Sequence, residues 1–560
     1  MVAMAEKEIS IEIKSLFSWI LLGVLLVALV AELQISFSTP IAFGDEGFYA
    51  HLSRWIAENK EYPVWVPFYG TDLIKWGNSK PLFLTLAESG FFLIFGYSDL
   101  FLKFLYPFIG FLTAISTYLL AKKLFSEKIG FFAAILIVTV SSIITYSIIF
   151  YVEIFSAFMF ITGGLLLILH ATTKRMRYLI LAGVFLGLGL LTKLPNYASG
   201  LFFVMALLYE VLESRKITKD IIKRYGIILL IAAIIVLPFF IRTYVNYNVF
   251  SCDVTFGQPN ICTTTYSYTP IKTSEGRADS GGTSSSLISY GILQYLDFSI
   301  GTVWFIPLLF LCGLVLMLAK RSKIEILLIL LLLSVIPVFY KTLTSRVEET
   351  SRFTIIAVPV IAIICGSYLE KITDFAKRYR RELEIAVIAI VIFIAFLNFG
   401  IPGIGQALGY SGKLSSLTGV KEFPASFFET CNWAKQNVAK DARLLSLHTH
   451  PTVYNCERAA FWETPDRLDI LSGNLSVSLA RLKINGYTHI FVQMFSVSSG
   501  FLDVSYPSDF VQMLDQNPQN FKKVFNSTNA DSLSSCTSKL SQGYYCDGGI
   551  IYEINYNGAA

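Results

Sequence analysis

Two adjacent acids, Asp45 and Glu46, follow the first long apolar run of the chain and open an amphipathic segment. Carboxylates at this place could take a proton from a substrate or bind a cation. Neighbouring residues of a helix point about 100° apart, so the two side chains cannot act as a matched pair on one face. We therefore expect one acid to face a substrate and the other to brace it. The alternative is that both acids only complement the dipole of a helix N-terminus.

Five further ionisable residues stand where apolar runs meet polar loops. They are Lys80, Glu153, Lys193, Arg242 and Arg352. An ionisable side chain at the centre of a bilayer costs about 2.5–3.5 kcal/mol on insertion scales, so each of them requires an explanation. Acids and bases on one side of a membrane indicate a site there, in which the acids would transfer a proton or bind a metal ion and the bases would bind an anion. Taken singly, Lys80 also fits a lysine lying along the interface, and Glu153 a solvated loop acid.

The apolar runs that position these residues are those of a polytopic membrane protein. The 560 residues are 54% hydrophobic and 15% charged, with a mean hydropathy of +0.59, whereas soluble domains carry about 25% charged residues. A net charge of +5 is too small to indicate a nucleic-acid partner. The run at 15–33 is long enough to span, and no small-residue cleavage site follows it. We expect a retained transmembrane helix there.

Basic clusters give the expected orientation. They lie at 122–128, 174–177, 215–224, 320–323 and 371–381, with Lys7 and Lys14 ahead of the first run. The positive-inside rule places them in the cytoplasm, which predicts about eleven spans, an N-terminus inside and a C-terminal region outside. The apolar segment 82–95 is short and contains Glu88. We expect it to lie along the outer face, within an outer platform at 34–100.

Two domains are predicted. The transmembrane domain covers 1–401 and includes a Gly/Ser/Thr-rich outer insertion at 247–289, which the composition predicts to be a flexible loop. After the last predicted span, 385–401, the pattern becomes that of a small α/β domain at 402–560. The expected helices are 427–439, 478–487 and 509–517, and the expected strands are 442–448, 488–495 and 549–556.

Six cysteines fall in the predicted outer regions. They form three pairs that are close in sequence, Cys252 with Cys262, Cys431 with Cys456, and Cys536 with Cys546. We expect disulfides, because the outer side is the oxidising one. The alternative is six unrelated buried thiols. Cys312 and Cys365 lie inside predicted spans and are expected to be free.

The order of these motifs resembles that of the GT-C glycosyltransferases, nearest the protein O-mannosyltransferases and the bacterial lipid A aminoarabinose transferases. The stretches that carry the likeness are DEGFYAHLSRWIAE, KPLFLTLAESGFFLIFGYSDLFLKFLYPFIGFLTAISTYLLAKKLF and LGLGLLTKLP. It covers about 43–250 well and the later spans loosely. Two features depart from the family. Leu82 replaces the second proline of the usual Lys-Pro-Pro, and the C-terminal domain is not the β-trefoil of eukaryotic protein mannosyltransferases. No WWDYG-like motif occurs in the sequence, which argues against an oligosaccharyltransferase.

The resemblance implies inverting transfer of a sugar, a hexose such as mannose, from a polyprenyl or dolichyl phosphate carrier to an acceptor hydroxyl on the outer face. It implies that Asp45 is the catalytic base and Glu46 its supporting acid. Lys80 and Lys193 would bind the lipid phosphate, and Glu153 would position the acceptor or a metal ion. Arg242 and Arg352 are added as phosphate clamps from the predicted topology alone.

The partners that follow are the carrier-linked donor and an acceptor that is a lipid-linked glycan, a lipid or a protein. No cofactor is certain, and Mg²⁺ or Mn²⁺ is an open alternative. The composition suits the plasma membrane of an archaeal cell. Two other functions stay open. A secondary transporter is disfavoured because the charges crowd the outer edge and no internal repeat is visible. A non-catalytic glycan-binding or assembly protein could use the same scaffold.

Overall fold

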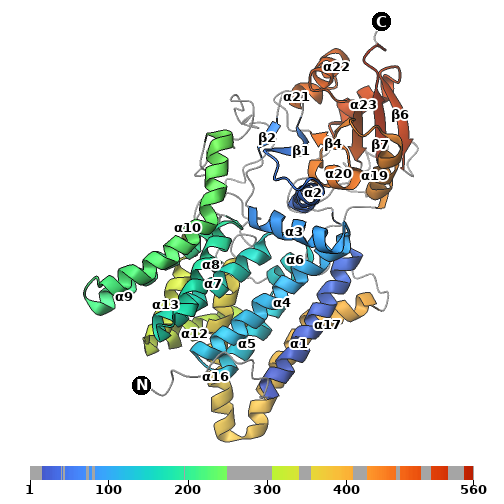
Figure 1. The fold of residues 1–560 in the computed structure, drawn as a ribbon. Helices are drawn as coiled ribbons and strands as arrows, with labels where there is room; N and C mark the ends of the chain where they lie inside the picture. The colour runs from blue at the N-terminus through green and yellow to red at the C-terminus, as the bar shows by residue number, and fades with distance from the viewer. Residues whose placement is uncertain are drawn as a thin grey trace, which may run out of the picture.

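The computed structural model describes residues 16–39, 41, 44–70, 75–77, 82–193, 196–248, 305–339, 355–407, 425–461, 467–493, 506–527 and 548–558. These residues form a helical body and an α/β domain that lies against one end of it (Figure 1). Residues 249–304, which include most of the predicted flexible insertion, lie outside the described part. So do the predicted pairs Cys252–Cys262 and Cys536–Cys546.

Long apolar helices build the helical body. Those long and apolar enough to cross a membrane are α1 (Leu16–Ser38), α4 (Asp99–Leu124), α7 (Glu153–Thr173), α9 (Tyr197–Ser214), α10 (Lys219–Tyr247) and the unit of η3 (Ile355–Ala357) with α16 (Val358–Tyr379). The other helices of the body are α5 (Glu127–Thr139), α6 (Ser141–Ile148), α8 (Met176–Leu190), α12 (Phe305–Lys320), α13 (Lys323–Leu333) and α17 (Arg381–Ala407). The described residues thus contain six candidate spans, or seven if the bent pair of α5 and α6 is one. The count of about eleven stays a prediction.

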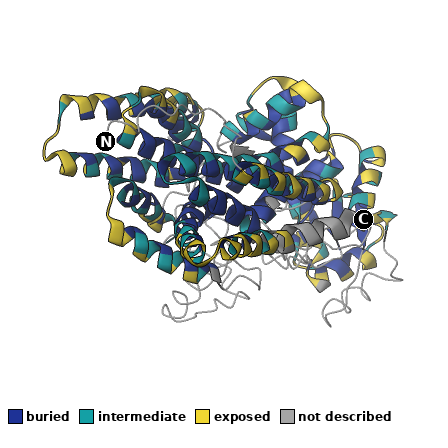
Figure 2. Ribbon diagram, turned by 90° about the horizontal axis from the view of Figure 1, so that it is seen from below, coloured by how far each residue is buried: buried dark blue, intermediate teal, exposed yellow. Residues whose placement is uncertain are grey.

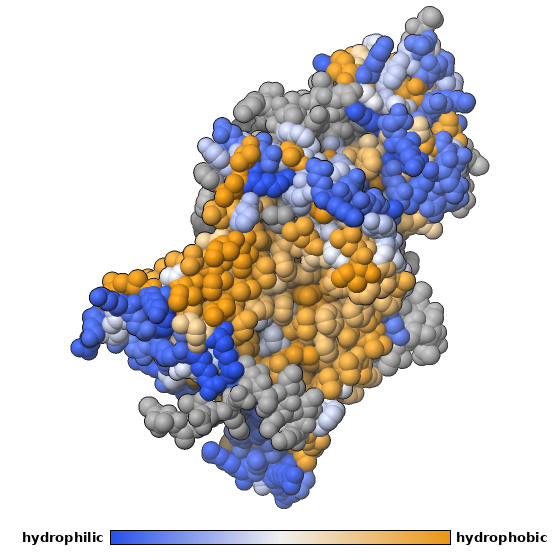
Figure 3. All heavy atoms as spheres, in the orientation of Figure 1, coloured by the Kyte–Doolittle hydropathy of each residue, from blue (hydrophilic) through white to orange (hydrophobic). Residues whose placement is uncertain are grey.

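Burial follows the composition of each helix. The residues of α7 are apolar on nearly every side, and it is buried among other helices, whereas α10 leaves Leu230, Ile234 and Ile241 exposed. Seen from below, buried residues lie inside the helical body and exposed residues on its outer helices (Figure 2). On the face that Figure 3 shows, an apolar band covers the helical body, with polar surface at both ends. This is the surface that a bilayer requires of a protein that spans it.

The helix ends that carry the basic clusters meet at the end of the body away from the α/β domain (Figure 1). Lys128 at the start of α5 pairs with Asp374 of α16 at 3.0 Å and with Glu384 of α17 at 2.5 Å. In the same way Lys174 and Arg224 pair with Glu210, at 2.8 and 2.9 Å. Ion pairs thus join α5 to α16 and α17, and the end of α7 to α9 and α10, at helix ends that carry four of the basic clusters.

The α/β domain contains the six elements that the sequence predicts, with bounds that differ by a few residues. Its helices are α19 (Ala425–Asn437), α20 (Thr449–Cys456), α21 (Arg467–Ile470), α22 (Leu475–Ile484) and α23 (Ser508–Gln516), and its strands are β3 (Arg443–Leu445), β4 (Ala459–Phe461), β5 (His489–Gln493), β6 (Phe521–Asn526) and β7 (Gly549–Ile554). All six predicted elements are confirmed. The short elements α20, α21 and β4, and the strand β6, were not predicted.

The sheet of this domain also contains two strands from the outer platform. β1 (Trp65–Gly70) and β2 (Lys75–Gly77) extend it, so that the strand order is β2-β1-β4-β3-β5-β7-β6. β1 runs parallel to β4, with Tyr69 opposite Ala460. The predicted boundary at 402 therefore separates two regions of sequence, but the platform and the α/β domain share one sheet.

The platform helix α2 (Gly44–Asn59) lies between α3 (Leu82–Phe95) and α20 (Figure 1). α3 has the bounds that the sequence predicts. At Gly47 the backbones of α2 and α20 approach so closely that an added Cβ would lie 2.6 Å from the carbonyl oxygen of His450. Asn455 of α20 donates to the carbonyl of Ile41 at 2.8 Å, and His450 Nδ1 lies 3.1 Å from the Tyr69 hydroxyl. α20 therefore fixes the first turns of α2.

A disulfide joins Cys431 of α19 to Cys456 at the end of α20, and this predicted pair is confirmed. Cys312 and Cys365 are free, as predicted. The disulfide holds α20, and with it the contact to α2, on the rest of the domain.

We predict that replacing both residues of this disulfide by serine, as Cys431→Ser with Cys456→Ser, lowers the thermal unfolding temperature. The bond spans 25 residues, and a loop of this size contributes about 3 kcal/mol to the free energy of unfolding. Unfolding is followed by intrinsic fluorescence of the protein in detergent. The control is Cys312→Ser, which removes a free thiol. An unfolding temperature equal to that of the control would show that the bond does not stabilise the domain.

Candidate functional site

The two acids of the platform lie in the first turn of α2, as expected for a pair of residues at a helix start. The Glu46 side chain is buried, and its Oε1 accepts a hydrogen bond of 2.6 Å from the backbone N–H of Phe150. Phe150 lies in the turn between α6 and α7. Glu46 thus ties α2 to the helical body. The side chain of Asp45 lies outside the described residues.

A buried ion pair lies one turn away, at the start of α7. Glu153 accepts from the ammonium group of Lys193, which follows α8, and the Glu153 side chain is only 1% exposed. Glu153 comes three residues after Phe150, the partner of Glu46. The helix termini that the sequence singled out separately are therefore adjacent in space.

The start of α3 belongs to the same region. The backbone N–H of Phe83 donates to the carbonyl of Leu191 at 3.2 Å, two residues before Lys193. The Phe83 ring also contacts that of Phe155, with centroids 6.3 Å apart. Lys80 itself lies outside the described residues. The chain three residues beyond it is nevertheless held beside the Glu153–Lys193 pair.

Lys103 on α4 is a residue of this region that the sequence analysis missed. It is 9% exposed, and its charge interacts with those of Asp99 and Glu46. Its signal in the sequence is a single lysine within the apolar run LFLKFLYP. A buried lysine next to Glu46 places a second positive charge near the start of α2.

Arg242 lies near the C-terminal end of α10 and contacts the platform. Its guanidinium donates to the carbonyl of Pro63 at 2.7 Å and lies over the Tyr62 ring, 4.5 Å from the ring centre. The Tyr247 hydroxyl donates to the carbonyl of Val64 in the same segment. These contacts fasten α10 to the chain between α2 and β1. Arg352 lies outside the described residues.

Two histidines near the platform are neutral at pH 7. Burial lowers the pKa of His51 and of His448 to about 4 in each case. The ring Nε2 of His51 lies 3.0 Å from the carbonyl of Pro67 and so donates to it. The neutral ring has one N–H, and His51 uses it in the hydrogen bond to Pro67, which holds β1 against α2. The carboxylates are thus the candidates for proton transfer.

A metal site can be tested only on the described part of the chain. There, no three His, Cys, Asp or Glu side chains come close enough to hold a metal ion. Glu46 and Glu153 each have a partner within the protein. The role of Glu153 in holding a metal ion stays a prediction.

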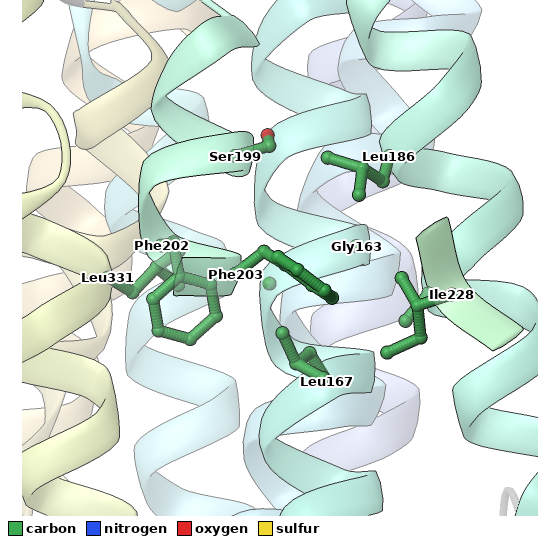
Figure 4. Close-up of a pocket in the computed structure, with 10 residues that line it drawn as sticks. Gly163, Leu167, Leu186, Ser199, Phe202, Phe203, Ile228 and Leu331 are labelled. Atoms are coloured by element: carbon green, nitrogen blue, oxygen red, sulfur yellow. The ribbon is translucent and has the colours of Figure 1, made fainter. Parts of the chain in front are cut away.

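An apolar pocket lies deeper in the helical body, between α7, α8, α9, α10 and α13 (Figure 4). The side chains that line it include Leu167, Leu186, Phe202, Phe203, Ile228 and Leu331, with Ser199 at its edge. Gly163, which also lines it, follows Glu153 on α7 by ten residues, or about 15 Å along the helix axis. The pocket is therefore at the depth of the apolar band, below the ion pair.

We predict that Lys193→Met lowers the unfolding temperature more than Lys193→Met combined with Glu153→Gln. Removing one partner of a buried pair leaves a charge without compensation and costs about 3–5 kcal/mol, whereas removing both charges costs less. The measurement is thermal unfolding of the three proteins in one detergent.

The matched control is Arg481→Met, which breaks an exposed pair with Asp469 at 3.3 Å. This substitution is expected to change the free energy of unfolding by less than about 1 kcal/mol. If the double variant were no more stable than Lys193→Met, the pair would not be electrostatically coupled.

Comparison with known proteins relates this geometry to characterised structures. Residues 79–241 match the family model described as dolichyl-phosphate-mannose-protein mannosyltransferase. The comparison with curated proteins gives no match. The matched segment begins one residue before Lys80 and ends one residue before Arg242, so it contains Glu153 and Lys193.

Solved structures match over nearly the whole chain. ArnT from Cupriavidus metallidurans bound to undecaprenyl phosphate is 13% identical, with a TM-score of 0.59, and the match covers 98% of this chain and 100% of that one. The oligosaccharyltransferase of Archaeoglobus fulgidus in the apo form is 12% identical, with a TM-score of 0.62 and coverages of 95% and 88%. The archaeal oligosaccharyltransferase AglB from Archaeoglobus fulgidus, in complex with an inhibitory peptide and a dolichol-phosphate, is 13% identical, with a TM-score of 0.60 and coverages of 93% and 75%.

At these identities the likeness concerns the fold. It extends through the helical body into the α/β domain and agrees with the motif match at 79–241. The resemblance found in the sequence is confirmed at the level of the fold: the chain has the GT-C fold that ArnT and AglB share.

Proposed function

We propose that the protein transfers a sugar from a polyprenyl-phosphate carrier to an acceptor hydroxyl at the platform. The observation that carries this proposal is the convergence of three helix termini at the border between the apolar band and the polar domain. Glu46 holds the first turn of α2 to Phe150, and the Glu153–Lys193 pair lies at the next turn of the chain. A lipid phosphate and a water-borne acceptor can meet at such a border.

The carrier class is supported by the shape and charge of this region. Lys193 and Lys103 provide positive charge near the start of α2, and the apolar surface of the helical body would lie beside an isoprenoid chain within a bilayer. The similar structures carry undecaprenyl phosphate in one case and dolichol-phosphate in another. A polyprenyl phosphate is therefore the carrier that we propose for this chain.

In the proposed reaction Asp45 is the general base. It takes the proton of the acceptor hydroxyl while that oxygen attacks the anomeric carbon from the face opposite the phosphate. The new bond joins the acceptor oxygen to the anomeric carbon, and the bond from that carbon to the phosphate oxygen breaks. The phosphate leaves on its carrier with the bonding electrons, and the configuration inverts. Lys80 and Lys193 stabilise the negative charge of the phosphate.

The other predicted residues take supporting roles in this proposal. Glu46 braces α2, and Glu153 orients Lys193 and positions the acceptor. Arg352 remains a proposed phosphate clamp. The contacts of Arg242 with Tyr62 and Pro63 favour a different role, in which it holds the platform on α10.

The description of the matching family supports a hexose such as mannose as the sugar. Lipid-linked glycans, lipids and proteins are all acceptors that carry a suitable hydroxyl. The basic helix ends lie opposite the α/β domain, and the positive-inside rule then supports a reaction on the extracytoplasmic face of the plasma membrane.

We predict that Asp45→Asn lowers the transfer rate by at least about 10²-fold, because the amide cannot accept the proton. The dissociation constant for the carrier lipid and the unfolding temperature should not change. The assay uses purified protein in lipid with radiolabelled polyprenyl-phosphate mannose or glucose, and follows the label into the lipid and protein fractions. The control is Glu58→Gln, which neutralises an exposed acid near the other end of α2.

A turnover of Asp45→Asn close to that of the wild type would refute the assignment of the base. If the wild-type protein transferred sugar from neither donor while it bound the carrier saturably, the protein would be a binding or transport protein on this scaffold.

A further inference from the structure

A single buried carboxyl group connects three helices behind the proposed site. Glu88 of α3 is fully buried. The Ser53 hydroxyl of α2 donates to its Oε2 at 2.5 Å, and the Tyr106 hydroxyl of α4 donates to its Oε1. We call these three residues the Glu88 cluster. It has no part in the reaction proposed above.

The partners of Glu88 are unusual for a buried acid. α3 is otherwise apolar, and burying a carboxyl group in such a helix is costly unless it is hydrogen-bonded. In the described part of the chain Glu88 has no cationic partner, and its hydrogen bonds come from two hydroxyl groups. An apolar residue at this position would fill space but would leave both hydroxyl groups without an acceptor.

The Glu88 cluster lies in direct contact with the residues that hold the site. The Tyr106 ring packs edge-on against Phe150 and Phe155, with centroids 4.9 and 5.4 Å apart. Phe150 supplies the N–H that Glu46 accepts. Ser53 follows Glu46 by seven residues, which is two helical turns, so both side chains lie on the same face of α2.

We propose that Glu88 is a positioning residue for the transfer step, whose carboxylate holds α2, and with it Asp45 and Glu46, in place against α3 and α4. The proposal rests on the proposed function. It assigns no contact between Glu88 and a substrate. Ser53 belongs to α2, so its hydrogen bond to Glu88 holds that helix directly. Tyr106 acts indirectly, because its ring packs on Phe150, whose N–H donates to Glu46.

The protonation state of Glu88 decides how strong this link is. A carboxylate accepts charge-assisted hydrogen bonds from both hydroxyl groups, whereas a carboxylic acid accepts one hydrogen bond and donates the other without charge assistance. Burial raises the pKa of Glu88 to about 7, and the hydrogen bonds from Ser53 and Tyr106 oppose that rise. The link therefore becomes stronger as the pH rises through about 7, and the transfer rate should rise with it.

Other titratable groups near the cluster come from each neighbouring helix. Tyr106 belongs to α4, and Tyr454 of α20 interacts electrostatically with Glu88. On α2, Tyr49 and Glu46 act electrostatically on Tyr106. None of them forms an ion pair with Glu88, so the two hydroxyl donors are the groups to vary.

The test measures kcat and KM for a radiolabelled polyprenyl-phosphate sugar across the pH range, for the wild type and Glu88→Gln. The amide accepts one hydrogen bond and donates the other at every pH, as the protonated acid does. Well above pH 7 we expect kcat of the variant to be about tenfold lower than that of the wild type, since a small misplacement of a catalytic group has a large effect on rate. Well below pH 7 the two should be equal, and KM for the carrier should not change.

Variants of the donors test the same idea with the carboxyl group in place. Tyr106→Phe and Ser53→Ala each remove one hydrogen bond to the ionised form, so each should move the inflection of kcat to higher pH. The matched controls are Tyr225→Phe, whose buried hydroxyl has no hydrogen-bond partner among the described residues, and Ser89→Ala, whose hydroxyl donates to the carbonyls of Thr85 and Ser53. These two should leave the inflection unchanged.

Stability gives a readout that does not need activity. The folded pKa of Glu88 lies above the ordinary value of 4.5, so the stability that its proton confers is present below about pH 4.5 and is lost as the pH rises to about 7. The unfolding temperature of the wild type should therefore fall over this window relative to that of Glu88→Gln.

Three outcomes decide the matter. An inflection that shifts in both donor variants and disappears in Glu88→Gln supports the proposal. An inflection and a kcat in Glu88→Gln identical to those of the wild type overturn it while the proposed function stands. Absence of transfer by the wild type overturns the proposed function and the role of Glu88 in it together, whatever the unfolding temperatures show.

Discussion

The close approach of α2 to α20 at Gly47 is the contact on which the arrangement of the proposed site depends. Any other residue would place a Cβ against the carbonyl of His450 and push the helices apart. On its other side α2 is held by Glu46 to Phe150 and by Ser53 to Glu88. The helix that begins with the two acids is thus fixed by the α/β domain and by the helical body at once. This leaves its first turn at the boundary of the apolar band.

The low polarity of that boundary explains why each buried acid has a specific partner. Glu153 is paired with a cation, Lys193, whereas the partners of Glu88 within the described part of the chain are hydroxyl groups. Hydroxyl groups carry no net charge, so the ionised form of Glu88 is stabilised much less than a carboxylate facing an ammonium group. Two acids of the same type therefore serve different purposes. One fixes a lysine near the proposed phosphate position, and the other responds to pH.

Local patterns allowed much of this structure to be predicted, and long-range contacts account for what was missed. The apolar run 82–95 and the elements of the α/β domain have periodicities that belong to their own residues, and α3 was predicted with its bounds. β1 was not, because it pairs with a strand of three residues nearly four hundred positions away, at Ala460. Asp45 and Glu46 were visible as an acidic pair. The roles of Lys103 and Glu88 were not, because their partners come from other helices.

The shared sheet changes how the α/β domain relates to the reaction. β1 belongs to the platform by sequence and to the sheet by hydrogen bonding. The helix that follows β3 in the chain, α20, packs on α2. A displacement of β4 or α20 would therefore move the chain that carries the acids. A domain joined in this way is part of the scaffold of the proposed site. Acceptor groups bound by the domain and donor groups bound in the helical body would meet at α2, whose position both regions determine.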